Sequence, residues 1–214
     1  MAQPDVSTMP DAVRVLPGAA GAPTMPPTMP PEAIAELTQA YQAASVILEY
    51  GSGGSTRLAA QLPGKTVFSV ESDLDWLRNL QAWLDAEPRA ATVHLHHADI
   101  GPTGKWGIPT DEKSFRKWPG YPNAVWDRPD FIHPDVVLVD GRFRLACMLT
   151  VSARITRPTV MLVDDYTMRP SYHRFESLQK PSGFADRMAR FDLIPQALPG
   201  AALPWIVDAY LRPK

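Results

Sequence analysis

Short apolar runs recur along the chain, and stretches with helical spacing separate them. The runs that predict strands are 46–48, 66–71, 92–97, 134–141 and 159–166. The stretches that predict helices are 32–43, 57–61, 74–84 and 144–153. Two later runs, 188–193 and 205–210, predict a closing hairpin. Alternating strands and helices of this kind predict an α/β fold with one doubly wound, mostly parallel sheet between two helical layers.

Two of the predicted helices have clear signals at their ends and on one face. The first begins near Pro31, since the first turn of a helix tolerates proline. The helix after the second strand can be capped by Ser72 or Asp73. Its apolar side is formed by Leu74, Leu77, Leu80 and Leu84. Trp76 and Trp83 add bulk to this helix, and we expect both to pack in the core.

A glycine-rich turn joins the first predicted strand to the helix that follows. It reads Gly51-Ser52-Gly53-Gly54, and two good helix caps, Ser55 and Thr56, come next. Glycine can adopt positive φ and bring the backbone close to a ligand. A strand, a glycine turn and a helix in this order form the first half of a nucleotide-binding βαβ unit.

Each predicted strand of the alternating region has an acidic residue at its carboxyl end or shortly after it. They are Glu49, Glu71, Asp99, Asp140 and the pair Asp164–Asp165. Ligands of doubly wound sheets bind outside the carboxyl ends of the strands, so acids at successive ends predict a site at this edge. Glu71 comes about twenty residues after the first strand, where a carboxylate can accept hydrogen bonds from ribose hydroxyls.

The charge near the glycine turn favours one class of cofactor. A dinucleotide turn would need glycine where Thr56 stands, and the carboxylate of Glu49 just ahead of the turn would repel a pyrophosphate. S-adenosylmethionine carries a positive sulfonium and a positive ammonium group, so a nearby carboxylate would attract it. The turn therefore favours S-adenosylmethionine over NAD as the cofactor.

At these positions the chain resembles the class I S-adenosylmethionine-dependent methyltransferases, over about 32–210. The resemblance rests on Glu49-x-Gly51-x-Gly53-Gly54, on Glu71 and on Ala98-Asp99. It implies a Rossmann-like seven-stranded sheet whose last strand is antiparallel. The cofactor-binding residues that it implies are Glu49, Gly51, Ser52, Gly53, Gly54 and Ser55 for the methionine part, Glu71 for the ribose, Asp99 with Ile100 for the adenine, and Asp140.

A narrower resemblance is to metal-dependent O-methyltransferases of the macrocin and catechol types. These have an acid at the end of the fourth strand and a pair at the end of the fifth, as Asp140, Asp164 and Asp165 do here. It implies a Mg²⁺ ion on these three carboxylates, which would bind a substrate hydroxyl and lower its pKa. The chain departs from the type at Arg142 and Arg144, which would repel a dication or bind an anionic substrate. The need for metal therefore stays open.

Several other side chains near this edge have two interpretations. His173 is a candidate general base, alongside Asp140 and Asp165 as catalytic residues, or it simply belongs to a surface helix that starts after Pro170. Arg142 and Arg169 can grip an anionic acceptor or pair with Asp164 and Asp165.

For three residues away from this edge, we expect a structural role. His94 and His96 share one face of the third strand, and we expect them to be satisfied strand histidines rather than metal ligands. Cys147 is expected to be a small core residue.

Two proline-rich segments frame the expected domain. Residues 1–30 predict a flexible arm, which leaves 31–214 as a single domain. Residues 101–129 contain Trp106, Trp118, Tyr121 and Trp126, and a loop of this length is often a lid or a pocket wall. Its aromatic side chains either stack on a ligand or anchor the loop to the body.

Composition and charge limit the kinds of partner and the compartment that we expect for this protein. The formal charge of −2 gives no basic footprint, so nucleic acid is not expected. No apolar run is long enough for a membrane span, and no secretory leader is recognisable at the N-terminus. One cysteine suits a reducing cytoplasm.

The sequence thus predicts a cytoplasmic S-adenosylmethionine-dependent enzyme that methylates an oxygen of a small molecule or sugar. The expected partner is a small acceptor with a hydroxyl group, and a homodimer is left open. Two alternatives remain. One is a domain that keeps this fold but has lost catalysis and serves in binding, and the other is an NAD-linked sugar oxidoreductase.

Overall fold

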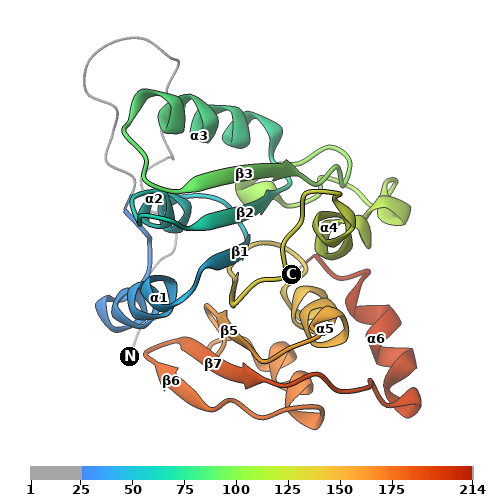
Figure 1. The fold of residues 1–214 in the computed structure, drawn as a ribbon. Helices are drawn as coiled ribbons and strands as arrows, with labels where there is room; N and C mark the ends of the chain where they lie inside the picture. Colours follow the sequence, from blue (N-terminus) through green and yellow to red (C-terminus); the bar gives the residue numbers. More distant parts are fainter. Residues whose placement is uncertain (1–25, 214) are drawn as a thin grey trace, which may run out of the picture.

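The computed structural model of the chain describes residues 26–213 (Figure 1). Most of the predicted N-terminal arm, residues 1–25, lies outside the described residues. The segment 26–30 has no regular structure, and the carbonyl of Thr28 accepts a hydrogen bond of 2.9 Å from Arg187. Within 26–213, none of the helices has both the length and the apolar character needed to cross a lipid bilayer.

A seven-stranded sheet in the order β3-β2-β1-β4-β5-β7-β6 forms the centre of the fold. The strands are β1 Val46–Tyr50, β2 Thr66–Glu71, β3 Thr92–His97, β4 Val136–Val139, β5 Thr159–Val163, β6 Gly183–Ala185 and β7 Met188–Leu193. β1 to β5 pair in parallel, whereas β7 pairs antiparallel with both β5 and β6. The predicted fold class is confirmed.

Helices cover both faces of the sheet, because alternate residues of the central strands point to opposite sides. The helices are α1 Pro31–Ala43, α2 Gly54–Ala60, α3 Leu74–Ala86, α4 Gly120–Asn123, α5 Arg144–Arg154 and α6 Leu203–Ala209. Leu48 and Val137 pack towards α5 and α6, while the neighbouring Ile47 and Leu138 pack towards α1 and α2 (Figure 1). Leu80 and Leu84 of α3 pack against Ala60 of α2 in a smaller cluster. Three layers result.

The start of α2 differs from the prediction. The helix begins at Gly54 with Gly53 as its N-cap residue, so Ser55 and Thr56 lie inside its first turn. The backbone N–H of Gly53 donates to the Thr56 hydroxyl at 2.9 Å, which brings the helix start back towards the strand.

The start of α3 is partly as predicted. Asp73 caps the helix by accepting from the N–H groups of Asp75 and Trp76, both at 3.0 Å. Leu74, expected on the buried face, is instead 38% exposed.

The second strand of the predicted closing hairpin is wrong. Residues 205–210 lie in α6 and the residue after it, whereas the hairpin partner of β7 is β6. A short apolar run fits a buried helix as well as a strand, and Pro204 sits where a helix can begin. β6 is only three residues long and contains a glycine, so its sequence gives no strand signal.

The loop 101–129 folds into short helical turns that lie over the sheet. They are the 3₁₀ segments Lys105–Gly107, Phe115–Lys117 and Ala124–Asp127, together with α4. Trp118, Tyr121 and Trp126 are buried in the main core cluster, whereas Trp106 is 65% exposed. Three of its four singled-out aromatic residues therefore anchor the loop to the body.

Candidate functional site

The turns after β1 and β4 touch at the carboxyl edge of the sheet. A Cβ on Gly51, whose φ is +99°, would lie 2.7 Å from the backbone nitrogen of Gly141. The turns are also tied to neighbouring strands, since the N–H of Gly51 donates to Val70 at 2.8 Å and that of Asp140 donates to Tyr50 at 2.8 Å. Gly51 is therefore needed for close packing between two turns, as well as for its backbone conformation.

Glu71 is held rigidly at the end of β2. Its Oε1 accepts from the N–H of Ser72 at 2.7 Å, from the N–H of Asp73 at 2.9 Å and from the Ser72 hydroxyl at 3.2 Å. Within residues 26–213, the only donor to its Oε2 is the N–H of Ser52, at 3.3 Å. Burial raises the pKa of Glu71, and these donors oppose the rise. One carboxylate oxygen thus keeps acceptor capacity next to the glycine turn.

Glu49 lies inside the protein, not on the ligand side of the turn. It is 0% exposed, and its two oxygens accept from the Tyr41 hydroxyl at 2.7 Å and the Thr56 hydroxyl at 2.6 Å. Burial raises its pKa, although these hydrogen bonds lower it. This position differs from the expected contact with a cofactor. Glu49 joins α1 to α2 and supports the turn from behind.

The rest of the glycine turn is fixed by side chains that the sequence did not single out for this role. The hydroxyls of Ser52 and Ser69 are 2.7 Å apart, and the indole N–H of Trp76 donates to the Ser52 carbonyl at 2.7 Å. Trp76 is half-buried beside the turn instead of in the core as predicted. Its position in the first turn of α3, soon after Glu71, was the available signal.

The two residues expected at the adenine position differ in their exposure to solvent. Asp99 is exposed, and its carboxylate accepts from Lys117 at 2.7 Å and from the N–H of Gly101 at 2.9 Å. The hydrogen bond from Lys117 is the main cause that lowers the pKa of Asp99. The side chain of Ile100 is buried, and its carbonyl accepts from the indole of Trp118.

Arg144 connects the turns after β4 and β5. It is buried at the start of α5, and it contacts Asp140 at 3.0 Å and Asp165 at 3.3 Å. It also donates to the carbonyls of Gly141 at 3.1 Å and Asp164 at 2.6 Å. One guanidinium therefore serves both acidic strand ends.

A second arginine completes this charge network. Arg187, in the turn between β6 and β7, holds the buried Asp164 through both carboxylate oxygens, at 3.0 and 2.8 Å. It also lies 3.2 Å from Asp165, which Arg169 approaches at 3.7 Å. Asp165 has a left-handed φ of 57°. Backbone outliers of this kind cluster at functional sites.

This network does not support the predicted Mg²⁺ site. Each of Asp140, Asp164 and Asp165 is paired with arginine, so positive charge already stands where a dication would bind. Across residues 26–213, no group of three or more His, Cys, Asp or Glu side chains is arranged to hold a metal ion. Arg144 was visible in the sequence as a departure from the metal-dependent type, whereas Arg187 was not.

Asp140 is a carboxyl group at this edge with a strongly raised pKa. Burial, with help from the charges of Asp164 and Asp165, raises its pKa to about 7, although Arg144 opposes the rise. Its side chain is 29% exposed, so it remains open to solvent. A partly exposed carboxyl group with a pKa near neutrality can act as a general base.

The raised pKa of Asp140 predicts a measurable effect on stability. A carboxyl group whose pKa rises on folding takes up protons, so its contribution to stability falls as the pH rises from about 4 to about 7. Asp140→Asn should remove this contribution. As the pH rises through this range, the free energy of unfolding of the variant should therefore increase relative to that of the wild type. The difference between them should change by at most about 1.4 kcal/mol per pH unit. Urea denaturation at several pH values measures it, with Asp75→Asn as a control for the loss of one exposed charge. Parallel curves for wild type and Asp140→Asn would contradict the assignment.

The remaining candidates lie around the same edge. His173 is exposed in the 3₁₀ helix Pro170–Ser177, and its Nε2 lies 3.0 Å from the Tyr166 carbonyl. Because that carbonyl can only accept, Nε2 carries the proton and Nδ1 is the nitrogen that can act as a base. Arg142 is half-buried, and within the described residues its guanidinium has no hydrogen bond or ion pair. It is therefore available for an anion.

The loop 101–129 closes over this edge. A Cβ on Gly107 would lie 2.5 Å from the Ser72 hydroxyl and 3.0 Å from the Glu71 carboxylate. The hydroxyl of Tyr121 lies against Gly141 and accepts from the N–H of Arg142 at 3.2 Å. The loop thus packs directly against the ends of β2 and β4.

The residues expected to be structural occupy such positions. Cys147 is buried within α5. His94 stacks on Phe68, with ring centroids 4.8 Å apart, and its Nδ1 lies 3.4 Å from Asp130. His96 differs, since its buried Nε2 has no hydrogen-bond partner in the described part of the chain.

Comparison with known proteins identifies the family. No protein-family model and no curated protein matches the chain. The crystal structure of a methyltransferase-like protein from Silicibacter pomeroyi DSS-3 is 47% identical in sequence, with a TM-score of 0.85. The match covers 88% of this chain and 98% of that one. A second solved structure, described as concerning the conversion of a disulfide bond into a thioacetal group during echinomycin biosynthesis, is 16% identical over 84% of this chain and 66% of that one. Its TM-score of 0.39 is too low to support an argument. The chain therefore belongs to the methyltransferase-like proteins.

Proposed function

We propose that the protein is an S-adenosylmethionine-dependent methyltransferase that methylates an oxygen of a small molecule. The observation that supports this most is the carboxylate of Glu71. Amide and hydroxyl donors saturate its Oε1, while its Oε2 keeps acceptor capacity beside the glycine turn. This arrangement suits the two hydroxyls of a ribose, and the family is that of methyltransferase-like proteins.

The donor set at this edge fits such a cofactor in part. Glu71 would hold the ribose and the backbone of Gly53 would face the methionine part, while Asp99 could accept from the adenine amino group once Lys117 is displaced. Gly54 was expected to join them, but it packs against Pro26 and Pro27 instead. Glu49 would support the turn without touching the ligand. The cofactor supplies an activated methyl group, and the chain's own residues have to position and deprotonate the acceptor.

Asp140 is the residue we assign to the deprotonation of the acceptor. With a pKa of about 7, Asp140 is about half ionised near neutrality and its carboxylate is basic enough to take up a proton, which is what a general base requires. Arg144 holds the carboxylate in place at 3.0 Å. Arg142, which has no partner within the described residues, would bind a carboxylate or phosphate group of the acceptor.

A second candidate is a binding domain that has lost catalysis. The observation that favours it is the loop 101–129, because Gly107 packs against Glu71 and Tyr121 packs against Gly141. A ligand that occupied the edge would have to displace part of this loop. If the loop does not open, neither sulfur nucleotide should bind.

Titration calorimetry separates these functions. S-adenosylmethionine and S-adenosylhomocysteine should both bind, and NAD should not, because the turn lacks the third glycine of a dinucleotide site. Binding of NAD alone would favour the oxidoreductase. Binding of none of the three would sink the methyltransferase proposal and favour the binding domain.

Glu71→Ala should weaken binding of S-adenosylhomocysteine at least about 100-fold. The reason is the loss of hydrogen bonds between a charged acceptor and the ribose hydroxyls, which contribute about 1.5–3 kcal/mol each. Calorimetry with the wild type and the variant measures the change. Asp85→Ala, which removes an exposed carboxylate in the last turn of α3, is the matched control and should bind as the wild type does. Equal affinity for Glu71→Ala and wild type would mean that the ribose lies elsewhere.

A further inference from the structure

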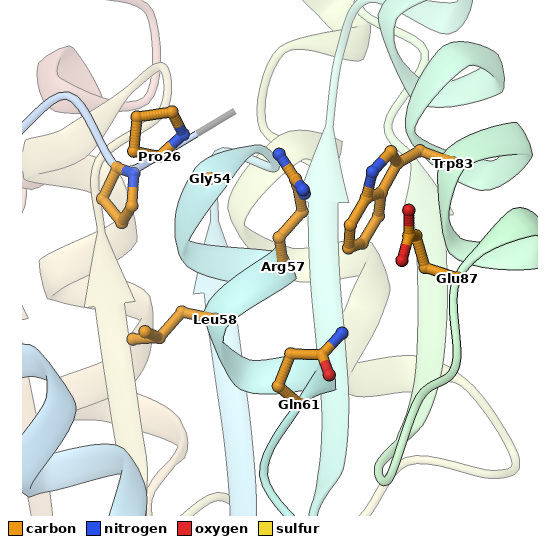
Figure 2. Close-up of a pocket in the computed structure, with 8 residues that line it drawn as sticks. Pro26, Gly54, Arg57, Leu58, Gln61, Trp83 and Glu87 are labelled. Carbon is orange, nitrogen blue, oxygen red and sulfur yellow. The ribbon is translucent and has the colours of Figure 1, made fainter. Parts of the chain in front are cut away.

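A cavity lies outside the strand-end site, between the segment 26–27 and the helices α2 and α3. It has a volume of about 400 Å³ (Figure 2). Pro26, Pro27 and Leu58 give it an apolar wall, and Arg57, Trp83 and Glu87 give it polar groups. This volume is within the range of small-molecule sites.

Arg57 is the main feature of this cavity. Its guanidinium stacks on Trp83, with Cζ 3.7 Å from the ring centroid, and Figure 2 shows it between Trp83 and the segment at Pro26. It forms no ion pair or hydrogen bond with any described residue. Stacking holds the side chain in place, and within residues 26–213 no acidic group forms a direct ion pair with its charge.

Two polar atoms beside this cavity lack partners. The Nε of Arg57 and the Nε1 of Trp83 are buried, and neither has a hydrogen-bond partner within residues 26–213. Buried donors without acceptors are rare and destabilising, so each one calls for an explanation. Both atoms are donors, which means that the missing group is an acceptor.

We propose that this cavity binds a small organic anion, a carboxylate or a phosphate ester, through Arg57 and Trp83. The outer nitrogens of the guanidinium make the first contact, and a small rotation of the stacked pair brings Nε and Nε1 to the bound oxygens. Pro26, Pro27 and Leu58 contact the apolar part of the ligand. This site is independent of the proposed methyl transfer.

Glu87, which also lines the cavity, provides a second test of whether the ligand is an anion. Figure 2 shows its carboxylate beside Trp83, and its charge acts on Arg57 without a direct ion pair. A bound anion would be repelled by it. Removing the charge with Glu87→Gln should therefore strengthen binding, while Arg57→Gln should weaken it.

The test follows the indole N–H signal of Trp83 by NMR at constant ionic strength, with the signal assigned from Trp83→Phe. The probes are succinate, which is a carboxylate, and glycerol 3-phosphate, which is a phosphate ester. The probe that binds more tightly shows which of the two groups the cavity prefers. We expect a saturable shift with a Kd of about 1 mM. Arg57→Gln should raise this Kd at least about tenfold and Arg57→Lys less, because lysine keeps the charge but lacks the planar fork. Glu87→Gln should lower it several-fold.

The proposal is overturned if neither probe gives a saturable shift. It is also overturned if Arg57→Gln titrates as the wild type does. Circular dichroism of each variant shows whether it is folded, and Arg57→Lys and Glu87→Gln keep the test decisive if Arg57→Gln is not.

Discussion

Asp140→Asn should slow methyl transfer about 10²- to 10⁴-fold, the usual contribution of a general base. The amide keeps the size of the side chain but cannot accept a proton from the acceptor hydroxyl. In the wild type, the rate should fall as the pH drops below about 7, because Asp140 becomes protonated. The variant should lose this dependence. Initial rates between pH 5.5 and 8.5 measure both effects, with an acceptor found by screening hydroxyl-bearing metabolites for methylation.

Affinity for S-adenosylhomocysteine separates lost catalysis from a damaged donor site. Asp140→Asn should bind it with nearly wild-type affinity, since Glu71 and the glycine turn are unchanged. Asp75→Asn, in the exposed first turn of α3, is the activity control. A wild-type rate for Asp140→Asn would remove Asp140 from the reaction and leave His173 as the candidate base.

Arg144→Ala should destabilise the protein by about 3–5 kcal/mol, the range seen when one partner of a buried ion pair is removed. The change leaves Asp140 and Asp165 without the guanidinium, and it strips the carbonyls of Gly141 and Asp164 of a donor. Chemical denaturation measures the loss. If the variant does not fold, Arg144→Lys gives a smaller but measurable loss, because lysine keeps the charge and cannot reach all four acceptors at once.

Arg169→Ala is the matched control for this prediction. Its side chain is half exposed, and its contact with Asp165 is longer, at 3.7 Å. Exposed pairs of this kind contribute about 0–1 kcal/mol. Equal losses for Arg144→Ala and Arg169→Ala would show that the buried network does not hold the two turns together.

The sequence predicted the parallel part of the sheet well. β2 and β3 have the predicted limits. For β2 the reason is that a buried parallel strand is an apolar run that ends abruptly at polar residues, whereas β3 is a half-buried edge strand that contains three histidines. The same reason placed Glu71 and Asp140 at strand ends. The capping side chain of Asp73 fixed the start of α3 in the same way, through a local signal.

The rest depended on contacts between distant residues. Arg187 comes 23 residues after Asp164 and meets it only because β7 folds back antiparallel beside β5. Glu49 was interpreted as a ligand contact because its depth depends on Tyr41 and Thr56, which belong to two different helices. The metal prediction was unsupported for the same reason: acids near each other in a sequence pattern say nothing about which cations the fold brings to them.

Arg187 also gives a mechanical link between the segment just before α1 and the acids at the edge of the sheet. The guanidinium that holds Asp164 donates at the same time to the carbonyl of Thr28. A displacement of residues 26–30 is therefore transmitted, through one side chain, to Asp164 and Asp165 at the end of β5, and the charge of Arg187 also acts on Asp140. Tension or a bound partner at that segment would reset the electrostatic balance around Asp140 without touching it.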